Sequence, residues 1–200
     1  MALDRDVVAD GLLDDLDRFE ELVRSIDPAE WDRPSRCGGW SVGDVARHVV
    51  GTLADVIAGK MDGLGSPEVT AREVAERAGC SPTELADECA EVRKAVAGML
   101  PLFDDAAWAG DAPGSYEGTL GDGVEALWYD TWLHADDIRA ALGRPTETGT
   151  GIAGGVSHVA FELRKRGWDG EVPTDGRMEW ILAATGRAET LPGLINIYAD

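Results

Sequence analysis

The chain has 200 residues, of which 38 are acidic and 18 are basic, and its formal net charge is −20. This charge repels phosphate backbones, and no cluster of basic residues interrupts it, so we expect no nucleic-acid partner. No apolar run approaches the ~18 residues that cross a bilayer. The first ten residues, MALDRDVVAD, are acidic and lack the pattern of a signal peptide. We therefore expect a cytoplasmic protein with no membrane partner.

The three cysteines, Cys37, Cys80 and Cys89, are odd in number and have no CxxC spacing. This pattern argues against a disulfide framework and against a zinc site built from cysteines. We expect all three to be reduced, with Cys89 in the core.

The first part of the chain has the apolar spacing of amphipathic helices. In residues 6–26, apolar side chains recur every three or four positions and acidic ones occupy the other face, which predicts a first long helix. Ser41 and Asp44 form a capping-box pattern that predicts a second long helix over residues 42–60. His48 lies at the edge of the apolar stripe of this second helix.

Further start and stop signals follow. A capping-box pattern formed by Thr70 and Glu73 predicts a short helix that ends at Gly79. The SPTE sequence that begins at Ser81 predicts a third long helix, which Pro101 ends. Residues 103–123 are rich in Gly, Asp and Ala, and we predict a long loop that lines a pocket, because such loops in compact domains are often functional.

A fourth long helix is predicted to begin near Gly121 and to end at Gly143, which can adopt the left-handed conformation of a C-cap. A fifth helix is predicted over residues 152–166. A sixth is predicted to be capped by Thr174, and residues 193–200 are expected to add a short extended piece.

These elements predict an all-α fold. The four long helices each have one apolar face, so we expect them to form a four-helix bundle within residues 1–145. Residues 146–200 are expected to form a C-terminal helical extension that packs on this bundle.

A candidate metal site follows from helical spacing. Asp130 and His134 are four residues apart, so their side chains leave the same face of the fourth helix, one turn apart. With His48 they have the composition of a site with two histidines and one carboxylate, which suits zinc, nickel or iron. The alternatives are a hydrogen-bonded core histidine at position 48 and a simple surface pair on the fourth helix.

Other residues near these positions have two interpretations each. Asp137 could orient a ligating imidazole by accepting from its second nitrogen, or it could be a solvated carboxylate. Trp40, Trp128 and Trp132 could line a pocket or belong to the core. His158 could be a further ligand or acid, but a surface position is favoured. No P-loop, GxSxG, HExxH or dinucleotide-binding pattern is present.

Two motifs carry a family resemblance: CGGWSVGDVARH at residues 37–48 and WYDTWLHADDIRAALGRP at residues 128–145. They resemble the paired motifs of the DinB-like metalloenzyme superfamily and, more closely, those of the mycothiol-dependent maleylpyruvate isomerase N-terminal domain family. The resemblance covers roughly residues 5–145. The matching positions are Cys37, Gly39, Trp40, Ser41 and His48 in the first motif, and Asp130, His134, Asp137, Gly143, Arg144 and Pro145 in the second.

The resemblance implies an up-and-down four-helix bundle that holds a divalent metal, zinc first, between two helices through His48, Asp130 and His134. It also implies a low-molecular-weight thiol, typically mycothiol, as cosubstrate. On this basis Trp40 and Arg144 are assigned to binding of the thiol, and Asp137 to the catalytic site. The carboxylate ligand of the family is commonly Glu, so the shorter Asp130 is expected to reach the metal through water or with a local helix shift.

The implied function is activation of a thiol for transfer to, or isomerisation of, an electrophilic small molecule. A metal with three protein ligands has an open position, and a thiol bound there loses its proton. Residues 146–200 are shorter than the second domain of the isomerase, so a thiol transferase is as compatible as an isomerase. A metal-dependent hydrolase and a non-catalytic binding bundle are the alternatives, and a homodimer is left open.

Overall fold

The computed structural model describes residues 3–114, 116–146 and 149–199. In these residues the regular structure is helical, apart from isolated β-bridges between Pro34 and Ser41 and between Asp111 and Thr119. The helices are α1 (Arg5–Arg24), α2 (Val42–Ile57), α3 (Pro67–Glu76), α4 (Pro82–Met99), α5 (Asp105–Trp108), α6 (Leu120–Ala141), α7 (Gly151–Lys165) and α8 (Arg177–Ala184), with short 3-10 helices at Pro28–Glu30 and Leu100–Leu102. None of the described helices is long and apolar enough to cross a membrane.

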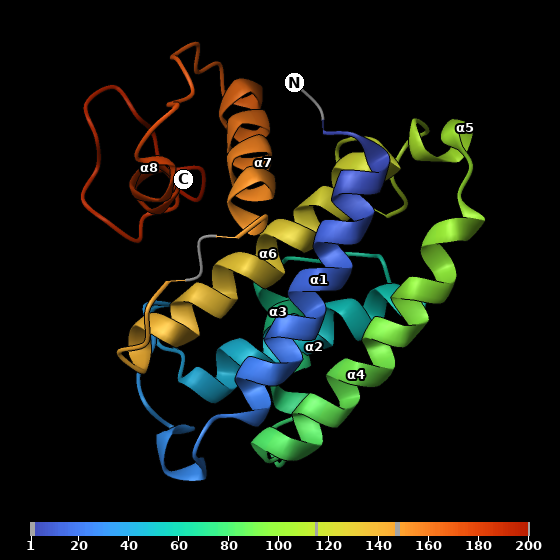
Figure 1. The fold of residues 1–200 in the computed structure, drawn as a ribbon, viewed down its shortest axis with the longest axis vertical. Coiled ribbons are helices and arrows are strands. Elements are labelled where there is room, and N and C mark those ends of the chain that lie inside the picture. The colour runs from blue at the N-terminus through green and yellow to red at the C-terminus, as the bar shows by residue number, and fades with distance from the viewer. Residues whose placement is uncertain (1–2, 115, 147–148, 200) are drawn as a thin grey trace.

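Helices α1, α2, α4 and α6 form a four-helix bundle (Figure 1), which confirms the all-α prediction. Helix α1 packs against α4 and α6, and α2 packs against the same two helices, so α1 and α2 are diagonal to each other. Arg24 at the end of α1 forms an ion pair with Asp87 near the start of α4. This contact shows that α1 and α4 run in opposite directions. Helices α1 and α6 run in the same direction, since Arg144 beyond α6 donates to Ser25 beyond α1.

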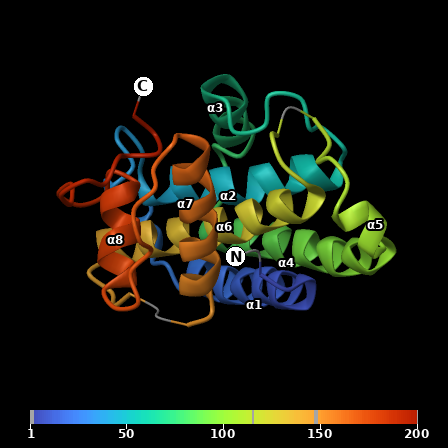
Figure 2. The ribbon, with the colours of Figure 1, turned by 90° about the horizontal axis from the view of Figure 1, so that it is seen from above.

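The neighbouring helices α1 and α6 would run in opposite directions in a simple up-and-down bundle. The difference comes from the long connection between α2 and α4, which contains α3 and acts as a crossover. In Figure 2, α3 is seen outside the bundle on the side of α2, and the two helices are packed together.

Capping boxes set the starts of three bundle helices. The Ser41 hydroxyl accepts from the Asp44 amide at 3.1 Å, and the Asp44 carboxylate accepts from the Ser41 amide at 3.0 Å. Ser81 and Glu84 form the same reciprocal pair at the start of α4, as the sequence predicts. A third box, Thr119 with Asp122, starts α6. The first turn of α6 and all of α5 therefore lie inside the segment 103–123 that was predicted to be a loop.

Helix α3 begins earlier than predicted. Ser66 is the N-cap, its hydroxyl accepts from the Val69 amide at 3.3 Å, and Pro67 occupies the first turn. The cap predicted at Thr70 is wrong, because Ser66 with a following proline is the stronger start signal. The consequence is that Glu73 is not a capping residue. It lies within α3 and its side chain is buried against α2.

The helices of the C-terminal part pack on α6. Helix α7 contacts α6 through close glycine contacts, since a Cβ at Gly154 would lie 2.7 Å from the Trp128 ring and one at Gly151 would lie 2.1 Å from the Trp132 ring. Trp128 and Trp132 are buried, which supports their interpretation as core residues. The side chains of α6 thus belong to two hydrophobic clusters, one inside the bundle and one shared with α7 and α8.

The end of the chain differs from the prediction in two respects. Helix α8 begins after Gly176, which has a φ of 65°, and Thr174 is not its cap. Residues 193–199 contain turns at 193 and 197–198 and no strand, and residue 200, the last of the predicted extended piece, lies outside the described residues. The Ile197 amide donates to the Ala184 carbonyl at 2.8 Å, so this last segment is attached to the end of α8.

Candidate metal centre

The three predicted ligands lie together between α2 and α6. The Nε2 atom of His48 is 3.7 Å from one Asp130 oxygen, and Nε2 of His134 is 3.4 Å from the other. The two imidazole rings are nearly perpendicular, with centroids 5.2 Å apart. One ligand atom from each residue lies within 4.8 Å of the others, a spacing that one divalent ion can bridge after small side-chain movements.

The second nitrogen of each histidine is bound to a buried carboxylate. Nδ1 of His48 lies 3.0 Å from Oε2 of Glu73, and Nδ1 of His134 lies 2.9 Å from Oδ2 of Asp137. Both carboxylates are fully buried, at 0% exposure. Carboxylates in these positions hold a proton on Nδ1 and leave the Nε2 lone pair for a metal, which is the usual arrangement around histidine ligands. The donor set therefore fits a divalent cation.

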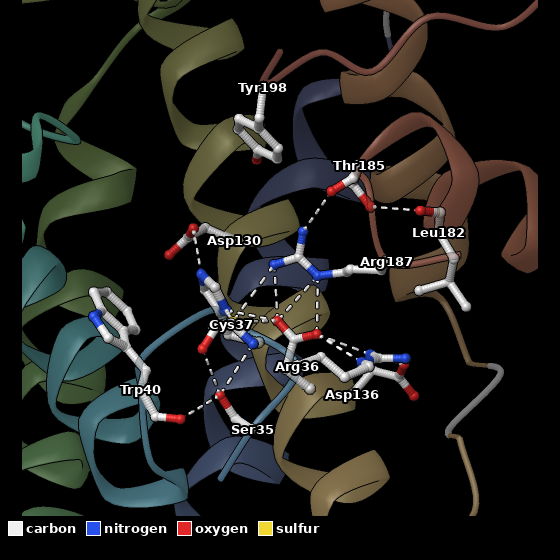
Figure 3. A network of polar contacts seen from close by, with 12 residues as sticks. Ser35, Arg36, Cys37, Trp40, Asp130, Asp136, Leu182, Thr185, Arg187 and Tyr198 are labelled. Carbon is white, nitrogen blue, oxygen red and sulfur yellow. Dashed lines mark hydrogen bonds and ion pairs between the residues drawn. The ribbon is translucent and has the colours of Figure 1, made fainter. Parts of the chain in front are cut away.

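Asp137 is held by two arginines, Arg36 and Arg187, which are both labelled in Figure 3. Arg187, beyond α8, donates from Nε to one Asp137 oxygen at 2.9 Å and from Nη2 to the other at 2.8 Å. Arg36 donates to Asp137 at 3.0 Å and to Asp136 at 2.6 Å. The two carboxylates and the two guanidinium groups balance in charge, so burial of Asp137 is electrostatically compensated.

The Cys37 thiol lies beside the same cluster, and its Sγ donates to Asp137 at 3.2 Å. Cys37, His134 and Asp137 form a second group of donor atoms within 4.8 Å of one another. This group would need Nδ1 of His134, the atom that Asp137 already binds. The candidate metal position is therefore the Nε2 side, where Asp130 lies between the two imidazoles.

The electrostatics of the site agree with this assignment. Burial would raise the pKa of Asp130, but the neighbouring His134 and His48 lower it to about 2. Burial opposes protonation of His134, yet Asp130 and Asp137 raise its pKa well above the ordinary value. Without a metal the site therefore holds a proton on His134, and a cation would take the place of that proton.

A cavity of about 1110 Å³ opens over the three candidate ligands. Its walls come from α2, α4, α6, α7, the segment around α5 and the last residues of the chain, and they include Trp40, Cys37, Met99, Leu127, His158 and Tyr198. The Trp40 ring lies 5.2 Å from the His48 ring, so Trp40 lines the cavity as the sequence suggested.

Two sequence predictions disagree with the structure. Arg144, assigned to binding of the thiol, lies outside the cavity lining and donates to Ser25 at 2.7 Å, because Gly143 turns the chain toward the end of α1. His158, for which a surface position was favoured, is only 7% exposed and lines the cavity, because it is on the face of α7 that packs on α6.

Sequence reasoning also missed two residues of the site, Glu73 and Arg187. Glu73 was placed in a capping pattern, and its burial depends on how α3 packs against α2. Arg187 follows a short helix with no motif, and no local signal indicates that it reaches Asp137, 50 residues earlier.

The sequence matches the family described as the mycothiol maleylpyruvate isomerase N-terminal domain over residues 12–139. No curated protein sequence matches the chain. Among solved structures, the fold is similar to that of a mycothiol-dependent maleylpyruvate isomerase, with a TM-score of 0.64. It is also similar to a mutant of such an isomerase in which a histidine is replaced by alanine, with a TM-score of 0.60. Each comparison has 15% sequence identity and covers 84% of this chain and 74% of the other.

At 15% identity the likeness to these isomerases concerns the fold. The family match is broader evidence, because residues 12–139 make up well over half of the chain and contain α2, α6 and the three candidate ligands. The chain therefore belongs to the mycothiol maleylpyruvate isomerase N-terminal domain family.

Proposed function

We propose that His48, Asp130 and His134 bind one divalent metal, zinc first, and that the protein uses it to activate a low-molecular-weight thiol for reaction with an electrophilic small molecule. The observation that carries this proposal is the convergence of both Nε2 atoms on Asp130 while both Nδ1 atoms are bound to buried carboxylates. Mycothiol is the first thiol to test, because it appears in the description of the family and of both similar solved enzymes.

A divalent cation lowers the pKa of a coordinated thiol and so favours the thiolate, the form that attacks carbon electrophiles. The protein's own contribution is to present the ligands in the required state. Glu73 and Asp137 fix the orientation of the two imidazoles. Asp130 supplies a negative charge between them, and its low pKa keeps it ionised at neutral pH.

Asp137 was assigned to the catalytic site from the resemblance, and we propose the narrower role of a positioning residue. The His134 ring and the Arg187 guanidinium outweigh the effect of burial and hold its pKa well below the ordinary range. A carboxylate held in this way does not accept a proton from a thiol near neutral pH. The thiol proton is therefore expected to leave to solvent through the cavity mouth.

Whether the product is a thioether or an isomer depends on the electrophile, and the family supports isomerisation as the first reaction to test. Taken as a whole, the cavity wall is more apolar than polar, which suits an organic thiol and its electrophile better than water. This environment favours attack by a thiol over attack by water.

The test compares the zinc-loaded wild type with His134→Ala, using mycothiol as the titrant in calorimetry. We expect the wild type to bind mycothiol with release of about one proton per thiol bound, and we expect His134→Ala to lose at least tenfold in affinity. Cys80→Ser is the matched control, because Cys80 lies outside the cavity lining. Equal mycothiol affinity in the wild type and His134→Ala would overturn the proposal in favour of a hydrolase or a binding module.

A further inference from the structure

One wall of the cavity carries three polar side chains that the proposed thiol chemistry does not use. The Tyr129 hydroxyl of α6 lies 2.9 Å from the Tyr198 hydroxyl of the last segment. The Tyr129 ring stacks on the His158 ring of α7, with centroids 4.4 Å apart. All three residues line the cavity that opens over the metal ligands. We call them the Tyr-His cluster.

The Tyr-His cluster has hydrogen-bonding capacity left over. The His158 side chain is more than nine-tenths buried, and its imidazole forms no hydrogen bond with any residue in the described part of the chain. Burial lowers its pKa to about 4, so the ring is neutral at physiological pH and offers one donor and one acceptor. One tyrosine hydroxyl can donate to the other, and the remaining O–H is then available to a ligand.

Tyr198 is placed near the metal site. Figure 3 shows its ring turned toward the cluster that contains Asp130 and Arg187. A group that reacts with a thiol at the metal could therefore reach the tyrosine pair in the same cavity. His158 and Tyr198 lie beyond residues 12–139, so two of the three residues of the Tyr-His cluster come from the part of the chain outside the family match.

The charges that line the cavity are compensated. Among the described lining residues, the lysine and the arginines each have an acidic partner. Arg36 and Arg187 bind Asp137, while Lys165 and Arg166 both bind Glu162. An anionic substrate would have to break one of these pairs or face the acidic partner, which costs free energy in a site of low dielectric.

Most of the remaining wall is apolar. Helices α2, α4 and α6 contribute Val56, Val96, Met99, Val124 and Leu127. Such a surface favours a ligand with a hydrocarbon body, and a few polar groups then fix its orientation.

We propose that the electrophile of this site is an uncharged carbonyl compound with a largely apolar body, and that the Tyr-His cluster binds its carbonyl oxygen. This inference rests on the proposed function, because it names the second substrate of the same metal site. It distinguishes the protein from an enzyme whose electrophile carries a carboxylate group, since Arg36 and Arg187 are engaged by Asp136 and Asp137, and Arg166 is engaged by Glu162.

The test uses a saturated ketone, which has no conjugated double bond for a thiol to attack, and no thiol is added, so that binding is measured apart from chemistry. We choose 4-phenylbutan-2-one and its para-sulfonate, because a sulfonate carries a negative charge but coordinates metals poorly. Each is titrated into zinc-loaded protein without thiol, with affinity read by calorimetry or by saturation-transfer NMR. We expect the neutral ketone to bind at least tenfold more tightly than the sulfonate.

The variants Tyr198→Phe and His158→Phe keep the rings and remove the polar atoms. We expect each to weaken ketone binding by about threefold to tenfold, the usual effect of one lost hydrogen bond. Tyr116→Phe is the matched control, because Tyr116 also lines the cavity but its hydroxyl already donates to the Asp122 carbonyl at 3.2 Å. We expect ketone binding by this control to equal that of the wild type.

Tighter binding of the sulfonate, or unchanged ketone affinity in both variants, would overturn the inference. The result is independent of the thiol experiment, since no thiol is present. Ketone binding with the expected variant effects would support the Tyr-His cluster as a carbonyl subsite even if mycothiol failed to bind, and in that case only the proposed thiol chemistry would fall.

Discussion

Nδ1 of His48 on α2 lies 3.0 Å from the Glu73 carboxylate on α3, which also accepts from the Thr52 hydroxyl at 3.1 Å. Glu73 is fully buried, and its other oxygen, Oε1, has no hydrogen-bond partner among the described residues. A buried carboxylate with a free oxygen is costly to keep. The cost is understandable if Glu73 holds His48 in the orientation that a metal needs.

We therefore expect Glu73→Ala to weaken zinc binding by about 10-fold to 100-fold, the usual effect of removing such a partner from a histidine ligand. Glu73→Gln keeps an oxygen that can accept from His48 and should recover part of this loss. Competition with a chromophoric chelator gives the affinities, and the ¹⁵N shifts of His48 report its tautomer. Glu76→Gln on the exposed face of α3 is the control. If Glu73→Ala bound zinc as the wild type does, Glu73 would be only a structural residue.

Zinc binding should release a proton from His134. In the metal-free protein, Asp130 and Asp137 outweigh burial and raise the His134 pKa well above 6.5, so the ring is protonated at pH 7. A metal ligand must be neutral, so binding displaces this proton and weakens as the pH falls through neutrality. Calorimetry in two buffers of different ionisation enthalpy measures the proton count, which we expect to be about one at pH 7. A count of zero would show that His134 is already neutral.

Burial of neutral His158 should make the folded state less stable in mild acid. Its pKa is about 4 when folded and near 6.5 when unfolded, so the unfolded chain binds more protons between these values. Stability from this group is present above pH 6.5 and is lost as the pH falls toward 4, by up to roughly 3 kcal/mol.

The measurement compares urea unfolding of the wild type and His158→Phe at pH 7 and pH 5, with both proteins free of metal. Phe keeps the stacking on Tyr129 and cannot be protonated. The variant should lose less free energy of unfolding between the two pH values than the wild type. Identical losses would mean that His158 does not titrate differently in the two states.

Arg187 links the C-terminal part of the chain to the candidate metal site. Arg187→Ala leaves the buried Asp137 with Arg36 and the His134 ring as its remaining cationic partners, and we expect a loss of roughly 3 kcal/mol in the free energy of unfolding. Arg177→Ala, at an exposed position on α8, should change it by less than about 0.5 kcal/mol. Urea unfolding measures both. Equal effects of the two substitutions would show that the pair with Asp137 adds no stability.

Local sequence determined the helices and one face of the site. The boxes at Ser41 and Ser81 set the starts of α2 and α4, because the caps use residues only three positions apart. The four-residue spacing of Asp130 and His134 places them on one face of α6 for the same local reason. His48 lies on another helix, α2, so helical spacing alone does not connect it with Asp130 and His134. The family motifs supplied that connection.

Only the tertiary structure decided which partners complete the site. Glu73 and His48 are 25 residues apart, and Arg187 and Asp137 are 50 apart, so each contact depends on how separate helices pack. Arg144 has a conspicuous place in its motif but turns away to Ser25, whereas His158 has no motif and faces the cavity. Periodicity indicates which face of a helix is apolar. Which element covers that face is set by long-range packing, and short sequence patterns do not contain that information.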